Sequence, residues 1–216
     1  MTRTALAART ALLSAPVLAL VSAALSPSVS DGDVGAMEAH RQAMLVGHAI
    51  SSVSIVLLTA GTIWLALTLV RNAPRLALVG GVLGVAGSLV VLFEDGVSAA
   101  EPAVVAGSGH AQALMLVDHI EASAARGLEP LALLGDFGLA LLAVAALRAG
   151  AARWSVVATA VGAFAEGIGF ASGTRVVVIA GFALLFVGLA GITTRCSAAA
   201  AMAAEPPIRQ PLSEGA

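Results

Sequence analysis

Long apolar stretches separated by short polar segments run through most of the chain. A helix needs about 20 apolar residues to cross the hydrocarbon core of a membrane. Five stretches meet this requirement with almost no charge: Leu45–Val70, Leu76–Phe93, Leu128–Leu147, Trp154–Phe170 and Val176–Ile192. The pattern predicts an all-α fold, a bundle of helices that spans the membrane several times.

A sixth apolar stretch, Thr10–Leu25, is shorter and contains Pro16. Basic residues precede it and the small residues Ser22 to Ala24 stand near its end, as in a signal peptide. Residues 1–30 are therefore expected to form either a retained transmembrane helix or a cleaved signal peptide. The bundle then has six helices, or five after cleavage, and the five later helices form a domain over residues 31–196.

The segment Glu94–Gly127 is too long for a simple turn, and residues 110–126 have the pattern of a short amphipathic helix. At about 100° per residue, apolar positions fall on one side and polar positions on the other. The apolar set is Leu114, Leu116, Val117 and Ile120, and the polar set is Gln112, Asp118 and His119. We expect this helix to lie on the membrane surface or to cap the bundle.

The distribution of arginines sets the expected orientation of the chain in the membrane. Eight of the eleven arginines fall on one side of the predicted spans, near the N-terminus, in the second and fourth interhelical loops and in the C-terminal tail. Positively charged loops usually stay in the cytoplasm. The chain is thus expected in a plasma membrane with a cytoplasmic C-terminus. Residues 197–216, which contain three prolines, are expected to form a disordered cytoplasmic tail.

Composition excludes several other classes of protein. Charged residues make up 11% of the chain and hydrophobic residues 59%, whereas a soluble domain carries about 25% charged residues. A net charge of −2 without a basic patch gives no expectation of nucleic-acid binding. The single cysteine, Cys196, excludes an intramolecular disulfide. The absence of lysine, with much Ala, Gly and Val, suggests a GC-rich bacterial genome.

Two methionines and two histidines form a stripe on the second helix. Met37, His40, Met44 and His48 are spaced by three, four and four residues, so they share one helix face. Thioether sulfur favours Cu(I), and imidazole binds copper, zinc or iron. The stripe predicts a site for copper or another transition metal near the outer surface. The alternative is that the methionines fill packing gaps and the histidines lie at the membrane interface.

Acidic residues within or beside the apolar stretches form the second candidate group. Ionisable groups inside a bilayer are costly and usually functional. Asp136 and Glu166 are flanked by alanines or glycines, which predicts that they face other helices rather than lipid. Glu129 lies seven positions before Asp136 on nearly the same helix face, and Glu94 and Asp95 end the third helix. These acids could bind a cation with His48, exchange protons, or only hydrogen-bond neighbouring helices.

No catalytic motif of the metalloprotease, serine hydrolase or phosphate-loop type occurs, so no catalytic residue is assigned and an enzymatic role is not favoured. The leading hypothesis is a membrane protein that binds or transports a small cation, a proton or a transition metal, at an outward-facing polar cluster. One alternative is a redox protein or enzyme whose histidines hold haem or a catalytic metal. Another is a structural or interaction module without a ligand. No particular protein partner is indicated.

Overall fold

The computed structural model describes residues 3–27, 33–122 and 126–204, and every regular element among them is helical. The elements are α1 (Arg3–Leu25), α2 (Val34–Leu69), α3 (Pro74–Gly107), α4 (His110–Glu121), the 3₁₀ turn η1 (Arg126–Leu128), α5 (Glu129–Arg148), α6 (Arg153–Ala171) and α7 (Arg175–Ala204). All of these helices except α4 and η1 are long and apolar enough to cross a membrane. The all-α, multi-pass fold expected from the sequence is therefore confirmed.

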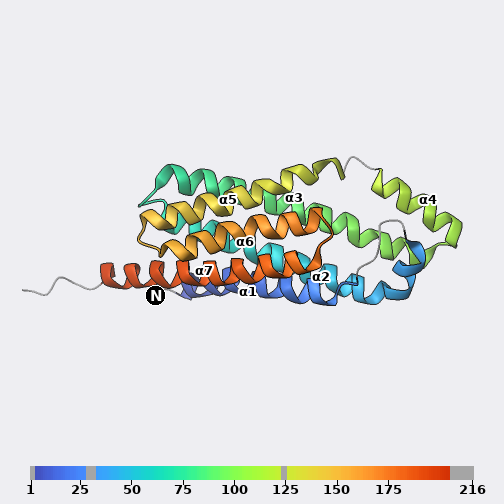
Figure 1. Ribbon diagram of the computed structural model, residues 1–216, viewed down its shortest axis with the longest axis horizontal. Helices are drawn as coiled ribbons and strands as arrows, with labels where there is room; N and C mark the ends of the chain where they lie inside the picture. Colours follow the sequence, from blue (N-terminus) through green and yellow to red (C-terminus); the bar gives the residue numbers. More distant parts are fainter. Residues whose placement is uncertain (1–2, 28–32, 123–125, 205–216) are drawn as a thin grey trace, which may run out of the picture.

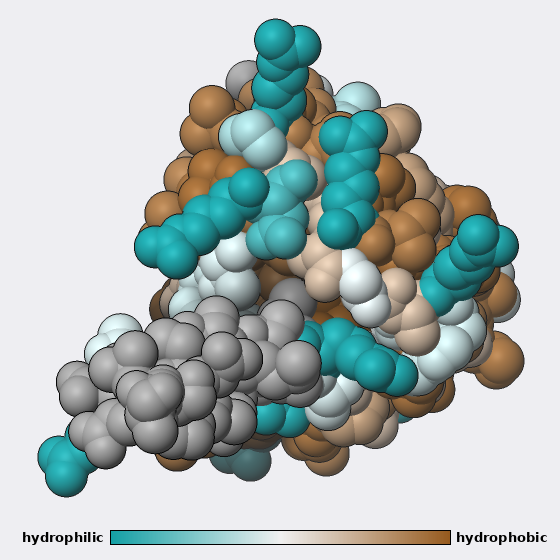
Figure 2. All heavy atoms as spheres, turned by 90° about the vertical axis from the view of Figure 1, so that its left-hand side faces the viewer, coloured by the Kyte–Doolittle hydropathy of each residue, from teal (hydrophilic) through white to brown (hydrophobic). Residues whose placement is uncertain are grey.

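The six long helices run up and down and form a closed ring (Figure 1). Each packs on the next along the chain, with α3 followed by α5, and α1 closes the ring against α7. The turns between α2 and α3 and between α5 and α6 carry Arg71, Arg75, Arg148 and Arg153 at one end of the bundle. We call this the Arg-rich end, and the opposite end the α4 end. Figure 2 shows hydrophilic side chains gathered on the Arg-rich end and hydrophobic atoms along the sides.

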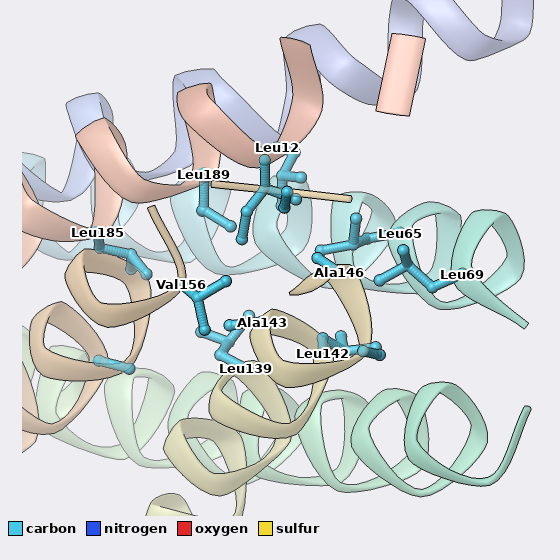
Figure 3. Packing of buried hydrophobic residues seen from close by; sticks show 14 of the residues in the cluster. Leu12, Leu65, Leu69, Leu139, Leu142, Ala143, Ala146, Val156, Leu185 and Leu189 are labelled. Atoms are coloured by element: carbon cyan, nitrogen blue, oxygen red, sulfur yellow. The ribbon is translucent and has the colours of Figure 1, made fainter. Parts of the chain in front are cut away.

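The main apolar core runs through the bundle from Val178 in the first turn of α7, and its buried leucines lie toward the Arg-rich end. Leu12 of α1, Leu65 of α2 and Leu142 of α5 are at most 1% exposed and meet Leu185 and Leu189 of α7. Figure 3 shows these side chains converging from helices around the ring. This core leaves no ionisable side chain among the described buried residues between Asp136 and the Arg-rich end.

Polar and small residues attach α1 to the rest of the bundle. The hydroxyl of Ser54 in α2 donates to the carbonyl of Ala15 at 2.7 Å, and the hydroxyl of Ser22 donates to the carbonyl of Gly47 at 2.9 Å. The Arg175 side chain of α7 donates to the carbonyl of Ala24. Hydrogen bonds of this kind join helices where the surrounding lipid provides no hydrophobic driving force.

Two helices extend well beyond their apolar stretches. The second helix, whose apolar stretch begins at Leu45, forms from Val34 and so includes the Met37–His48 stripe as expected, and Asp33 caps it by accepting from the amide of Ala36. The stretch expected to end at Phe93 stays helical to Gly107. With 36 and 34 residues, α2 and α3 are each more than 50 Å long at about 1.5 Å per residue, against about 30 Å of hydrocarbon.

The excess length of α2 and α3 forms, with α4, a lobe beyond the other helices (Figure 1). Val34 and Met37 of α2, Val105 of α3, and Ala113 and Val117 of α4 make a second apolar core there, each at most 5% exposed. We call this the α4 lobe. The face of α4 that packs in this lobe carries Val117, a member of the apolar set predicted from the sequence, and Ala113, which the prediction did not include.

The bounds of α5 and α6 agree with the predicted stretches within one residue, whereas those of α4 and the C-terminal helix differ. Leu114 and Leu116, members of the predicted apolar set of α4, are 37% and 38% exposed. The helix expected over residues 110–126 ends at Glu121, and residues 123–125 lie outside the described part of the chain. The tail expected to be disordered from residue 197 continues α7 as helix to Ala204. Residues 205–216 lie outside the described part, as do 28–32 between α1 and α2.

Candidate functional site

A three-residue hydrogen-bonded group joins α2 to α3 near the α4 end. The Nδ1 atom of His48 lies 2.8 Å from Oδ1 of Asp95, and the hydroxyl of Ser52 donates to Oδ2 of Asp95 at 2.6 Å. His48 and Ser52 are four residues apart, so one face of α2 presents both side chains to the same carboxylate. We call these three residues the His48 group.

The His48 group lies at the membrane boundary rather than in the apolar core. The hydroxyl of Ser22, in the last turn of α1, is bonded to Gly47, the neighbour of His48. His48 is therefore level with the α4 end of α1. The His48 and Asp95 side chains keep 23% and 11% of their surface exposed, which gives the imidazole access from the α4 side.

The hydrogen bond to Asp95 determines which nitrogen of His48 faces a ligand. With Nδ1 donating to the carboxylate, the second ring nitrogen, Nε2, is the one presented to a proton or a metal ion. A carboxylate behind a histidine fixes the orientation of the ring, as in many metal-binding histidines. The group is thus a candidate acceptor for a small cation.

A pair of carboxylates, Asp136 and Glu166, lies deeper, between α5 and α6. Asp136 is only 6% exposed, and a Cβ atom built on Gly167 of α6 would lie 2.7 Å from its Oδ2 atom. Glu166, the neighbour of Gly167, is close enough for its charge to interact with that of Asp136. Both acids belong to helices that span the membrane. We call them the carboxylate pair.

Glycines allow the helices around the carboxylate pair to approach closely. A Cβ atom on Gly87 of α3 would overlap the backbone of Gly135, the residue before Asp136. A Cβ atom on Gly181 of α7 would lie 2.9 Å from the Cα atom of Glu166. These backbone contacts fix both acids at crossings between helices, where no lipid separates them.

An aromatic pair closes the lipid side of the same crossing. Phe137 of α5 and Phe164 of α6 make an edge-to-face contact with ring centroids 5.1 Å apart. Because Phe137 follows Asp136 along α5, its ring points away from the carboxylate and is 52% exposed. The rings hold α5 and α6 together beside the pair.

The two groups lie at different depths, although the sequence suggested one cluster at a single level. Gly135, next to Asp136, packs on Gly87, and Asp95 lies eight residues further along α3. Eight helical residues span about 12 Å. The bonding partner of His48 is Asp95, which follows the apolar stretch of α3, rather than Asp136 or Glu166.

The Met/His stripe of α2 is divided among different environments. Met37 is 2% exposed in the core of the α4 lobe, and Met44 packs against that core. His40 is exposed, and His48 is bonded to Asp95. Among the described residues, no three His, Cys, Asp or Glu side chains lie close enough together to hold one metal ion.

The other sequence candidates have simpler placements. Glu94 is half-buried in α3, and His119 is exposed on α4. Glu129 is the first residue of α5 and His110 the first of α4, but their side chains lie outside the described part, as does that of Cys196.

Ser52 is the one member of the His48 group that sequence reasoning did not single out. Its signal was present, since it lies one helical turn after His48. Serines are common in transmembrane helices, however, and most of the hydroxyls here bond to a carbonyl of their own helix, as Ser88 and Thr159 do. Only the position of Asp95 on the neighbouring helix distinguishes Ser52.

In comparisons with known proteins, no family model, no curated protein and no solved structure matches the chain. The arguments for function therefore start from the His48 group and the carboxylate pair.

Proposed function

We propose that this multi-pass membrane protein takes up protons from the α4 side and holds them at the carboxylate pair. The observation that carries the proposal is the placement of Asp136 and Glu166 on adjacent helices within the membrane-spanning bundle, near enough for their charges to interact. Two carboxylates in a low-dielectric interior repel strongly when both are charged. A proton bound to either of them removes that repulsion, so the site has a specific use for a small cation.

The His48 group supplies the entry to this site. It is partly exposed at the α4 end and about 12 Å above the carboxylate pair. Histidine is the side chain best suited to exchange protons near neutral pH. In this proposal His48 takes a proton from the aqueous phase on the α4 side, and Asp95 and Ser52 orient its ring.

The apolar core limits passage toward the Arg-rich end. Leucines from α1, α2, α5 and α7 fill that half of the bundle, as Figure 3 shows. The proposal is thus for uptake and release on one side, with passage through the bundle only when these helices separate. The distribution of arginines supports a cytoplasmic Arg-rich end and C-terminus in a plasma membrane.

Infrared difference spectroscopy of the protein in lipid vesicles tests the proposal directly. A change from alkaline to acidic buffer is expected to produce the C=O stretching band of a protonated carboxyl group. The band is expected to be lost in the double variant Asp136→Asn/Glu166→Gln and kept in Glu38→Gln, which alters an exposed acid of α2. An identical carboxyl band in the double variant would overturn the proposal.

A second candidate, binding of a transition metal at the His48 group, is favoured by the carboxylate behind the imidazole. The metal would then bind Nε2 of His48 and water, while Asp95 orients the ring through Nδ1. Elemental analysis after incubation with Cu(I) or Zn²⁺ separates the two functions. A stoichiometric metal that is lost in His48→Ala supports this candidate, and equal metal content in both proteins excludes it.

A further inference from the structure

One face of α3 carries exposed apolar side chains along its entire length. Leu78, Val82, Leu89 and Phe93 are 65%, 61%, 56% and 52% exposed, and Gly96 continues the same line. Their separations of 4, 7, 4 and 3 residues keep them within about 60° of one another on the helix. This stripe is the lipid-facing surface of α3.

The lower part of the stripe borders an entirely apolar groove of about 460 Å³. Ile63 and Leu67 of α2 form one wall, and Leu78, Val82 and Leu89 of α3 form the other. The groove lies between the two helices in their membrane-spanning portions, where lipid acyl chains fill such surfaces.

The upper part of the stripe borders a second groove, of about 580 Å³, between α3 and α4. Phe93, Gly96 and Ala100 line it from α3, and His119 and Ile120 line it from the last turn of α4. Leu89 ends the lower groove and Leu92 begins the upper one, so less than one turn of α3 separates them. His119 is the one polar residue that lines either groove.

The upper groove rises out of the hydrocarbon layer. From Pro74, α3 crosses about 30 Å in about 20 residues and reaches the boundary near Phe93. Ala100 lies about 10 Å further along the helix axis. An apolar groove at this height is not covered by the bilayer core, although contact with water is unfavourable for it.

We propose that the upper groove binds an acyl chain of a phospholipid from the leaflet on the α4 side. The continuity of the stripe supports this occupant, because a chain can move from the lipid-covered lower groove into the upper one without crossing polar surface. Gly96 leaves the space open, since a Cβ atom there would meet nothing within 4 Å.

Photochemical labelling in vesicles tests this site. The full chain is reconstituted in phosphatidylethanolamine and phosphatidylglycerol with a small fraction of phosphatidylglycerol that carries a diazirine at the end of one acyl chain. After irradiation, peptides are mapped by mass spectrometry. Labels are expected on residues 96–100 and 119–120 of the α4 lobe, in addition to the ordinary lipid-facing positions of α3.

A matched pair of glycine variants provides the control. Gly96→Leu fills the groove, whereas Gly107→Leu adds the same side chain to α3 at a position that does not line it and where a Cβ atom also meets nothing within 4 Å. We expect the upper labels to fall at least threefold in Gly96→Leu and to be unchanged in Gly107→Leu. Thermal unfolding verifies that both variants are folded.

Two results would overturn the inference. One is wild-type labelling that stops at the level of Phe93. The other is upper labelling that Gly96→Leu leaves unchanged, which would mean that the chain end reaches these residues from bulk lipid. Neither result bears on the carboxylate pair, which the labelling does not involve.

Discussion

One carboxylate oxygen of Asp95 in α3 lies 2.8 Å from Nδ1 of His48, and the other accepts a hydrogen bond from the hydroxyl of Ser52 at 2.6 Å. One acidic side chain therefore connects two residues of α2 that lie a helical turn apart. The connection is made at the boundary where α2 and α3 leave the ring of six helices. It joins the membrane-spanning part of this hairpin to the α4 lobe.

The first prediction concerns this connection. Asp95→Ala removes both hydrogen bonds and is expected to lower the free energy of unfolding by about 1–2 kcal/mol. Denaturation by sodium dodecyl sulfate in mixed micelles measures the change. Glu38→Ala, at an exposed position, is the control and should unfold like the wild type. Equal stability of the Asp95 and Glu38 variants would mean that the bonds to His48 and Ser52 contribute nothing.

The second prediction concerns the crossing of α3 and α5. Gly87→Ala places a methyl group against the backbone of Gly135 and forces the helices apart. Overpacking of this kind costs about 1–3 kcal/mol. Gly107→Ala, on the same helix with open space around it, is expected to stay within about 0.5 kcal/mol of the wild type. The same unfolding assay measures both variants. A smaller loss of stability in Gly87→Ala than in Gly107→Ala would contradict the close contact between α3 and α5.

The third prediction separates packing from metal binding in the Met/His stripe. Met37 is buried in the core of the α4 lobe, so Met37→Ala leaves a cavity that costs about 2–5 kcal/mol. The expected result is faster proteolysis within α4, with unchanged metal content. His40→Ala removes an exposed side chain and should leave the digestion pattern as it is. Loss of a bound metal in both variants would instead favour the stripe as a metal site.

The fourth prediction concerns the carboxylate pair as one unit. Because Asp136 and Glu166 interact, the effects of Asp136→Asn and Glu166→Gln on stability should not add. A double-mutant cycle is expected to give a coupling energy of about 0.5–3 kcal/mol. The cycle of Asp136→Asn with Glu38→Gln is the control and should be additive. Additive effects in both cycles would show that the two acids act independently.

The fifth prediction is that α1 stays in the mature protein. Leu12 is fully buried, and a Cβ atom on Gly61 of α2 would lie 2.6 Å from the Leu12 Cβ atom. Removal of residues 1–25 would expose this part of the core and leave the Ser54 hydroxyl and the Arg175 guanidinium group without their carbonyl partners in α1. Intact-mass measurement of protein purified from membranes should retain this segment. A product that begins after Leu25 would identify it as a signal peptide.

The membrane-spanning helices could be predicted because their physical requirement is simple. A run of about 20 apolar residues is visible without any knowledge of its neighbours. The extension of α3 was missed because Ala, Gly and Glu at positions 94–107 form a helix without a continuous apolar pattern. This part of α3 packs against α4 through Val105, and the pattern within one segment does not reveal that contact.

The candidate residues were harder to predict than the helices. The burial of Asp136 follows from its position among apolar residues of α5. The pairing of His48 with Asp95, by contrast, depends on the relative rotation of α2 and α3, which helical periodicity within one segment does not determine. The buried face of α4 was equally hard to predict, because both faces of this helix carry apolar residues. Contact with Met37 and Val105 determines that Ala113 and Val117 are buried.

The leucines of the main apolar core close the interior of the bundle toward the Arg-rich end. In the proposed function, a proton that reaches the carboxylate pair from the α4 end meets the leucines beyond Asp136 and returns the way it came. Such a protein can respond to the proton concentration on one side of the membrane without dissipating the ion gradient across it. Only a variant that opens the leucine core, for instance by shortening Leu142 or Leu189, would let ions cross the membrane through the bundle.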